Sequence, residues 1–288
     1  MIKMVLQKGV LQDYSHYCHP GIHWSSDWYP VSDEVSLYVV TFTPFIPVTT
    51  PAIVMISGLA SVIDGFREVL IELSRDFVIY FVDTREKASS RLSGKVRFTV
   101  ETFGTDITTL VKMLNLQDGK FLLFGYSLGA TVIVDCYRNL PEKPSCMVLL
   151  EPNATFNYPK FSVAIMRLNL PFLYLLKPLV KWYIRQFRIN RKEDYEMYKI
   201  SARSLDNAHP VRLRKTALGI SDYRIWDKLA LLDRPVLIVG SSKDRFHSHE
   251  ETKRMVEEIW NCKYIDLENN KRSHSAELGI VIREYLGG

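Results

Sequence analysis

The residues best suited to chemistry stand together near the middle of the chain, in the segment Gly125-Tyr126-Ser127-Leu128-Gly129. An apolar run, Phe121 to Phe124, precedes this segment, and a helical pattern follows it. Gly-x-Ser-x-Gly between a buried strand and a helix is typical of a nucleophile elbow, a sharp turn that presents a serine hydroxyl beyond the strand. The glycines suit the turn because a side chain at either position would collide with the neighbouring strand or helix. The sequence therefore predicts Ser127 as a nucleophile.

A serine nucleophile needs two partners, because a base must take its proton and a third group must hold the base in one tautomer. Asp244 follows the apolar run Pro235 to Gly240, and His274 follows the last predicted strand by one loop. Serine, acid and histidine then occur in the chain order that enzymes with a serine elbow on a parallel sheet use. We predict that Asp244 and His274 complete the catalytic group.

Each partner has an alternative. Glu151 also ends a predicted strand, directly after the elbow helix, and is the alternative acid. His247 and His249 lie close to Asp244, but at the start of the next helix, where we expect them to be exposed or to cap it. His274 is therefore preferred as the base.

Acyl transfer through Ser127 also requires donors for a tetrahedral oxyanion. The first predicted donor is the backbone N–H of Leu128, the residue after the nucleophile, at the start of a helix whose dipole favours negative charge. The second is the N–H of Leu59, in the turn after the strand that ends near Ile56, with Ala60 as a substitute.

Strands and helices alternate around these residues. The predicted strands are Val35 to Phe42, Pro51 to Ser57, Phe77 to Val82, the elbow strand, Ser145 to Leu150, Pro235 to Gly240 and Cys262 to Leu267. Helices are predicted at Ile63 to Ser74, Thr99 to Leu114, Thr131 to Asn139, His249 to Trp260 and Ser275 to Tyr285. Short continuous apolar strands alternating with helices predict an α/β fold, a doubly wound and mostly parallel sheet. Ligands bind beyond the carboxyl ends of the strands in such sheets.

Regularity stops between Ala154 and Arg224, which we interpret as a helical lid inserted into one core made of residues 1–153 and 225–288. The stretch from Phe161 to Ile184 is rich in apolar residues, but its prolines and interspersed lysine and arginine argue against a transmembrane helix. Eight basic residues and no acidic one occur between positions 160 and 192: Lys160, Arg167, Lys177, Lys181, Arg185, Arg188, Arg191 and Lys192. We predict that the apolar face of this lid lines an acyl or aromatic pocket, and that its basic face meets an anionic group or a membrane surface. The simpler alternative is that the basic residues form a solvated helix face.

Composition and short motifs limit the other classes of function and partner. The chain has 288 residues, 47% of them hydrophobic, which is enough for a large core. Four widely spaced cysteines and an amino end unlike a signal peptide predict a cytoplasmic protein with reduced thiols. His16, Cys18, His19 and His23 lack the spacing of a metal site, so we expect a packed amino-terminal arm. Neither a phosphate-binding loop nor another cofactor motif is present, and we expect no cofactor, metal or nucleic-acid partner.

The motifs resemble those of the α/β-hydrolase superfamily. The elbow matches, as do four further segments. Ser57-Gly58-Leu59 resembles the family's His-Gly-x turn, and Asp83 to Ser90 its Asp-x-Arg-Gly-x-Gly-x-Ser loop. Arg234 to Gly240 with Asp244 resembles its strand and acid segment, and His274 with Glu277 its base and following helix. Ser57 departs from the usual histidine, and Glu86 and Ala88 from glycines. The resemblance implies a serine hydrolase that cleaves a carboxylic ester, or second a thioester, through an acyl-enzyme. The alternative is a non-catalytic protein that keeps the fold to bind a ligand.

Overall fold

The computed structural model describes residues 12–156, 158, 160–168, 178, 182, 195–243 and 247–287. One mixed sheet runs through this part of the chain, in the order β1-β2-β4-β3-β6-β7-β8-β9, with the short β5 paired to β2. The strands are β1 (Ile22–Pro30), β2 (Val35–Pro44), β3 (Ala52–Ile56), β4 (Ile79–Asp83), β5 (Arg91–Leu92), β6 (Phe121–Tyr126), β7 (Met147–Leu150), β8 (Val236–Gly240) and β9 (Cys262–Asp266). All the neighbours from β4 to β9 pair in parallel. The predicted doubly wound, mostly parallel sheet is confirmed.

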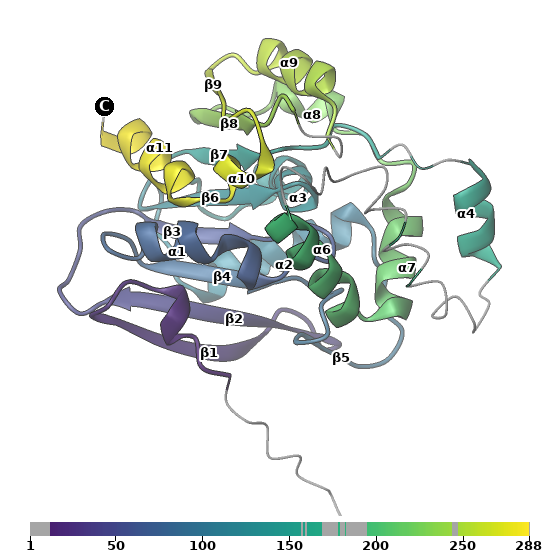
Figure 1. Cartoon of the computed structure of the whole chain (residues 1–288), viewed down its shortest axis with the longest axis horizontal. Helices are drawn as coiled ribbons and strands as arrows, with labels where there is room; N and C mark the ends of the chain where they lie inside the picture. The colour runs from purple at the N-terminus through teal and green to yellow at the C-terminus, as the bar shows by residue number, and fades with distance from the viewer. Residues whose placement is uncertain are drawn as a thin grey trace, which may run out of the picture.

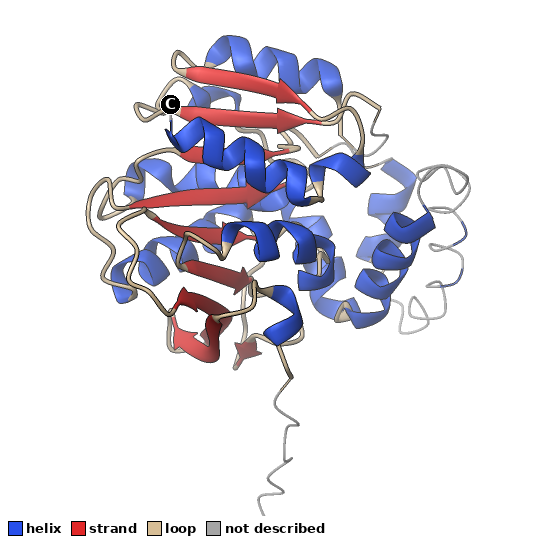
Figure 2. Cartoon of the chain, turned by 60° about the vertical axis from the view of Figure 1, so that its left-hand side comes forward, coloured by secondary structure: helices blue, strands red, loops and turns tan. Residues whose placement is uncertain are grey.

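Helices cover both faces of the sheet (Figures 1 and 2). One face carries α2 (Val100–Met113), α3 (Leu128–Cys136), α8 (Trp226–Leu229) and α9 (His249–Glu258), and the other carries α1 (Arg67–Leu73) and α11 (Ala276–Gly287). Short helical turns are η1 (Ser15–Tyr17), η2 (Ile63–Phe66), η3 (Tyr137–Asn139) and α10 (Asn270–Ser273).

The central strands are apolar along their whole length because both of their faces are buried. In β3, Val54 and Ile56 belong to one hydrophobic core, while Ile53 and Met55 belong to the other. These four side chains have no exposed surface. Alternate residues of a strand point to opposite faces, so a continuous apolar run is what a sheet between two helical layers requires.

The amino-terminal segment packs on the core, as predicted, through the buried Tyr14, Tyr17 and Cys18, and it continues into a strand that was not predicted. Residues Ile22–Pro30 form β1, which pairs antiparallel with β2 from Ile22 opposite Pro44 to Pro30 opposite Ser36. All nine residues of β1 are partly buried or exposed. Within the described part of the chain, no group of three or more His, Cys, Asp or Glu side chains is arranged to hold a metal.

Between β7 and α8, the described residues form the helices α4 (Lys160–Arg167), α6 (Tyr195–Asn207) and α7 (Pro210–Ile220). Thr155 and Arg224, near the two ends of this segment, form an isolated antiparallel bridge. The central strands point toward these helices (Figure 2), and Arg214 Nη1 of α7 donates to the Met166 carbonyl oxygen of α4 at 2.5 Å. No helix within the described ranges is long and apolar enough to cross a membrane. Six of the eight basic residues of the predicted lid lie outside the described residues: Lys177, Lys181, Arg185, Arg188, Arg191 and Lys192.

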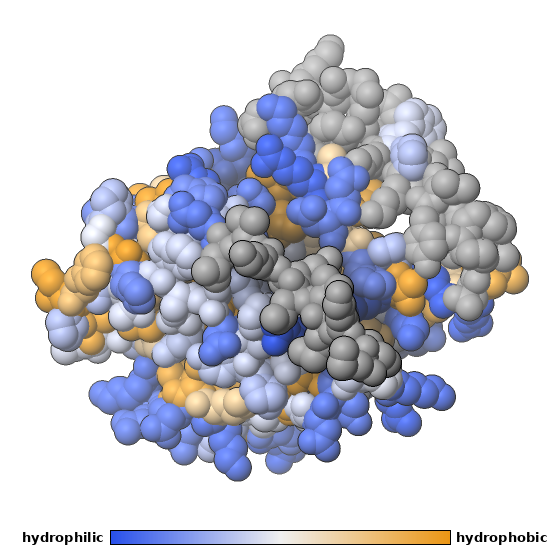
Figure 3. All heavy atoms as spheres, turned by 90° about the horizontal axis from the view of Figure 1, so that it is seen from below, coloured by the Kyte–Doolittle hydropathy of each residue, from blue (hydrophilic) through white to orange (hydrophobic). Residues whose placement is uncertain are grey.

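The surface seen from below Figure 1 is mostly hydrophilic, and its apolar residues form small, separate patches (Figure 3).

Candidate active site

Ser127 lies in a strained turn between β6 and α3. Its backbone has φ +52° and ψ −112°, a left-handed conformation that is uncommon for a residue other than glycine. A Cβ atom at Gly125 would lie 2.6 Å from the backbone of Ala130, and one at Gly129 would lie 2.2 Å from the carbonyl oxygen of Ile56. Both glycines are therefore required by the close approach of α3 to β6 and β3. Strain that packing holds in place in this way clusters at functional sites.

The Ser127 hydroxyl has two side-chain contacts among the described residues. His247 Nε2 lies 3.0 Å from Ser127 Oγ, and Asn153 Nδ2 donates to the same oxygen at 2.9 Å. The Asn153 backbone is held in turn by α3, because its carbonyl oxygen accepts a hydrogen bond from Thr131 Oγ1 at 2.8 Å. An Oγ that accepts from Asn153 directs its own proton toward His247.

Glu151 lies on the other side of the His247 ring. Its Oε2 is 3.4 Å from His247 Nδ1, at ion-pair distance but too long for a well-formed hydrogen bond, and it accepts no hydrogen bond from the described residues. The other carboxyl oxygen, Oε1, accepts from Ser241 Oγ at 2.5 Å and from Ser273 Oγ at 2.9 Å. Glu151 is 1% exposed, and its φ of +45° is a second strained backbone at the end of a central strand.

This geometry suits proton transfer. With its proton on Nδ1, facing Glu151, His247 offers the Nε2 lone pair to the Ser127 hydroxyl. Once the ring is protonated, the buried Glu151 carboxylate stabilises the imidazolium, and the 3.4 Å contact can shorten as charge develops. Ser127, His247 and Glu151 thus have the spatial arrangement of an activated nucleophile, its base and the group that orients the base.

His274, the base that the sequence favours, contacts the elbow through Tyr126. It is 9% exposed, and its ring packs edge-on against Tyr126 with centroids 4.9 Å apart, and against Phe66 at 5.2 Å. Its Nδ1 lies 3.1 Å from the Asn270 carbonyl oxygen and 3.2 Å from Ser273 Oγ. Asp244, the predicted acid, lies outside the described residues.

His247 differs from the sequence expectation, which ranked it behind His274 as exposed or capping. The cap of α9 is instead Ser248, whose Oγ accepts from the Glu251 N–H at 3.2 Å. The His247 side chain is only 9% exposed and turns inward to the elbow. The polar sequence around position 247 gives no indication that this side chain turns inward. The feature that could have pointed to the pair is that His247 and Glu151 both follow strands of the parallel sheet.

The two predicted oxyanion donors lie at the ends of neighbouring strands. Leu128 begins α3, and Leu59 lies in the turn after β3, where the Ser61 N–H donates to the Gly58 carbonyl oxygen at 3.1 Å. Ala60 in the same turn has a φ of +56°. Within the described ranges, the N–H groups of Leu59 and Leu128 donate to no other protein group. Unbonded N–H groups beside a nucleophile can hold an oxyanion.

A cavity of about 360 Å³ lies beside the Leu59 turn, between η2, α6 and the loop after β4. Its lining includes Asp64, Asp83, Glu86, Lys87 and Asn207, and does not include Ser127. Burial raises the pKa of Asp83, although Lys87 and a hydrogen bond from Ser89 oppose that shift. The lining also includes Val62, Ile63 and Leu213, so the wall is mixed, and its charged groups distinguish this cavity from the apolar pocket that the sequence predicts.

Comparison with known proteins agrees with this fold. The family model described as the alpha/beta hydrolase fold matches residues 51–272. The structure is similar to a hydrolase from Pseudomonas aeruginosa PA01 (TM-score 0.76, 16% identity, covering 92% of this chain and 99% of that one). It is also similar to the esterase EaEST from Exiguobacterium antarcticum (TM-score 0.76, 16% identity, covering 92% of this chain and 100% of that one). A third similar structure is an enol-lactonase from Burkholderia xenovorans LB400 (TM-score 0.75, 14% identity, covering 91% of this chain and 100% of that one). No curated protein sequence matches the chain.

Proposed function

The chain belongs to the alpha/beta hydrolase fold family, and on this premise we propose that it is a serine hydrolase that cleaves a carboxylic ester or thioester through an acyl-enzyme on Ser127. The observation that carries the proposal is the 3.0 Å contact between Ser127 Oγ and His247 Nε2, on a strained elbow. Placement of a nucleophile within hydrogen-bond reach of a base is the signature of nucleophilic catalysis.

In the proposed reaction, His247 Nε2 takes the Ser127 proton as Oγ bonds to the acyl carbon. The carbonyl oxygen becomes an oxyanion held by the N–H groups of Leu59 and Leu128. When the tetrahedral intermediate collapses, the bond to the leaving alcohol or thiol breaks, and that group takes the proton from His247. Water then attacks the acyl-enzyme with His247 as base, which releases the acid and restores the Ser127 hydroxyl.

Glu151 is the proposed partner of His247, because it is buried and its unbonded Oε2 faces His247 Nδ1. His274 with Asp244, the pair that the sequence favours, is the alternative base and acid. The two arrangements share Ser127 and the oxyanion donors, and they differ in which histidine touches the nucleophile.

Esters rank first as substrates because one of the similar structures is named an esterase and another an enol-lactonase. Thioesters rank second. We propose further that the basic residues between Lys160 and Lys192 favour a substrate with an anionic group, or approach to an anionic membrane surface.

A fluorophosphonate probe tests the reaction class. We expect it to label Ser127, and we expect Ser127→Ala to abolish labelling and to lower ester hydrolysis by about 10⁴-fold or more. Lack of labelling in the native chain would favour the non-catalytic, ligand-binding alternative. A panel of p-nitrophenyl esters and acyl thioesters of graded chain length, with and without an anionic leaving group, then identifies the substrate class.

A further inference from the structure

Lys87 is a buried lysine beside the oxyanion turn. It lies in the loop between β4 and β5, is 8% exposed, and its Nζ donates to the Gly58 carbonyl oxygen at 2.6 Å. The same Nζ lies 2.9 Å from Glu86 Oε1, a close ion pair whose angles are not those of a hydrogen bond. A buried lysine is rare because removing its charge from water is costly. Its contact with Gly58 therefore calls for an explanation.

The explanation lies in the peptide that joins Gly58 to Leu59. Its carbonyl group and the N–H of Leu59 belong to one planar unit, and in a trans peptide the two point in opposite directions; the described chain contains no cis peptide. A cation that holds the Gly58 carbonyl oxygen therefore also fixes the direction of the Leu59 N–H. Donation to that oxygen polarises the peptide as well, which makes its N–H a stronger donor.

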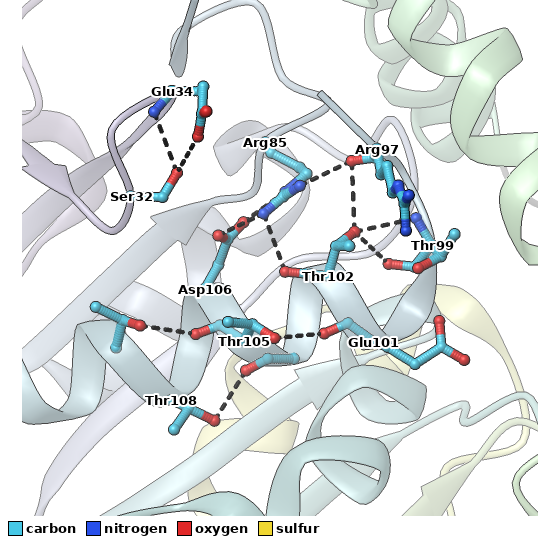
Figure 4. A network of polar contacts seen from close by, with 12 residues as sticks. Ser32, Glu34, Arg85, Arg97, Thr99, Glu101, Thr102, Thr105, Asp106 and Thr108 are labelled. Atoms are coloured by element: carbon cyan, nitrogen blue, oxygen red, sulfur yellow. Dashed lines mark hydrogen bonds and ion pairs between the residues drawn. The ribbon is translucent and has the colours of Figure 1, made fainter. Parts of the chain in front are cut away.

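The loop that carries Lys87 is anchored on two sides. On one side, Arg85 Nε and Nη2 donate to the two carboxyl oxygens of Asp106 in α2 at 2.7 and 2.6 Å, and Arg85 also reaches the carbonyl oxygens of Arg97 and Thr102 (Figure 4). On the other side, Arg212 Nη1 of α7 donates to the carbonyl oxygens of Lys87 and Ser90 at 2.5 and 2.9 Å. The backbone of Lys87 is therefore held in place, which a residue that positions another group requires.

We infer that Lys87 is a positioning residue of the oxyanion hole, which orients and polarises the Gly58–Leu59 peptide so that the Leu59 N–H binds the oxyanion. The inference rests on the proposed function. Stability alone does not account for the charge, because replacing a buried ion pair with apolar side chains is often neutral or stabilising. A role in orienting a donor does account for it, because donors that are fixed before the reaction bind the transition state most strongly.

The test replaces the ammonium while keeping the length of the side chain. We expect Lys87→Met to lower kcat by about ten- to a hundredfold, less than the loss of an entire oxyanion donor, and to leave KM within about twofold. Affinity for a trifluoromethyl ketone transition-state analogue should fall in parallel with kcat/KM. Lys87→Arg, which keeps a charged donor, should recover part of the loss, and Lys95→Met, at an exposed position, should change nothing.

Two outcomes overturn the inference: an unchanged kcat in Lys87→Met, or a loss that appears in KM alone while the affinity for the ketone is kept. If Lys87→Met does not fold, as judged by its thermal melt, the comparison of Lys87→Arg with Lys87→Gln decides. Greater activity of Lys87→Arg than of Lys87→Gln supports the inference, and equal activity of the two variants contradicts it. Fluorophosphonate labelling separates this result from the proposed function. Native protein that is not labelled at Ser127 refutes the hydrolase proposal, whereas labelling at the native rate in Lys87→Met refutes only the role of Lys87.

Discussion

Two histidines approach the elbow from neighbouring strand ends, and they meet it in different ways. His247, after β8, has the nucleophile 3.0 Å from one ring nitrogen and a buried carboxylate 3.4 Å from the other. His274, after β9, has a backbone carbonyl and a serine hydroxyl at Nδ1, and its ring packs on Tyr126 and Phe66. The two rings therefore differ in their printed contacts: His247 lies between Ser127 and Glu151, an arrangement in which an imidazole can take a hydroxyl proton and have its charge stabilised.

Changing each histidine to glutamine tests which of the two rings takes the Ser127 proton. His247→Gln removes the base, so we expect kcat to fall by about 10⁴- to 10⁶-fold, while His274→Gln, which disturbs the packing of Tyr126, should cost about tenfold or less. Steady-state hydrolysis of a p-nitrophenyl ester measures both variants, with His249→Gln as the control two residues further along. The reverse ranking would assign the base to His274.

The acids can be compared in the same way. Glu151→Gln keeps the shape of the side chain but removes the charge that faces His247 Nδ1, so kcat should fall by about 10³- to 10⁴-fold. Asp244→Asn should have a much smaller effect if His247 is the base. The control is Glu142→Gln, at an exposed position. Loss of activity in Asp244→Asn with little change in Glu151→Gln would show that the chain uses the acid favoured by the sequence.

A smaller effect is expected at Asn153, which donates to Ser127 Oγ. Asn153→Ala removes one hydrogen bond, worth about 1 kcal/mol, and should lower kcat by about fivefold to tenfold. Asn153→Asp should be more harmful, since a carboxylate accepts the hydroxyl proton and competes with His247 for it. Pre-steady-state acylation by a p-nitrophenyl ester measures this step, with the exposed Asn139→Ala as control. Equal rates in the Ala and Asp variants would mean that Asn153 does not direct the proton.

Much of the fold was predictable from local pattern. A central strand with both faces buried is a continuous apolar run, so Ala52–Ile56 and Val236–Gly240 stand out in the sequence. The predicted helix from Ile63 to Ser74 begins as the 3-10 turn η2 before α1. Strand β1 was missed because its residues are all half-buried or exposed and many of them are polar; among the described strands it pairs with β2 alone.

Local sequence was enough to identify Ser127 as the candidate nucleophile and to place the strand ends around it, because a turn as tight as the elbow admits only glycine at positions 125 and 129. It also marked Glu151, since an acid at the end of a buried strand stands out. Local sequence does not show which histidine touches Ser127 or which amine holds the Gly58 carbonyl oxygen; these contacts depend on the tertiary structure. Those contacts act over about 3 Å, while His247 is 120 positions from Ser127 and Lys87 is 29 from Gly58. The path of each loop across the sheet edge sets such distances, and no local pattern encodes that path.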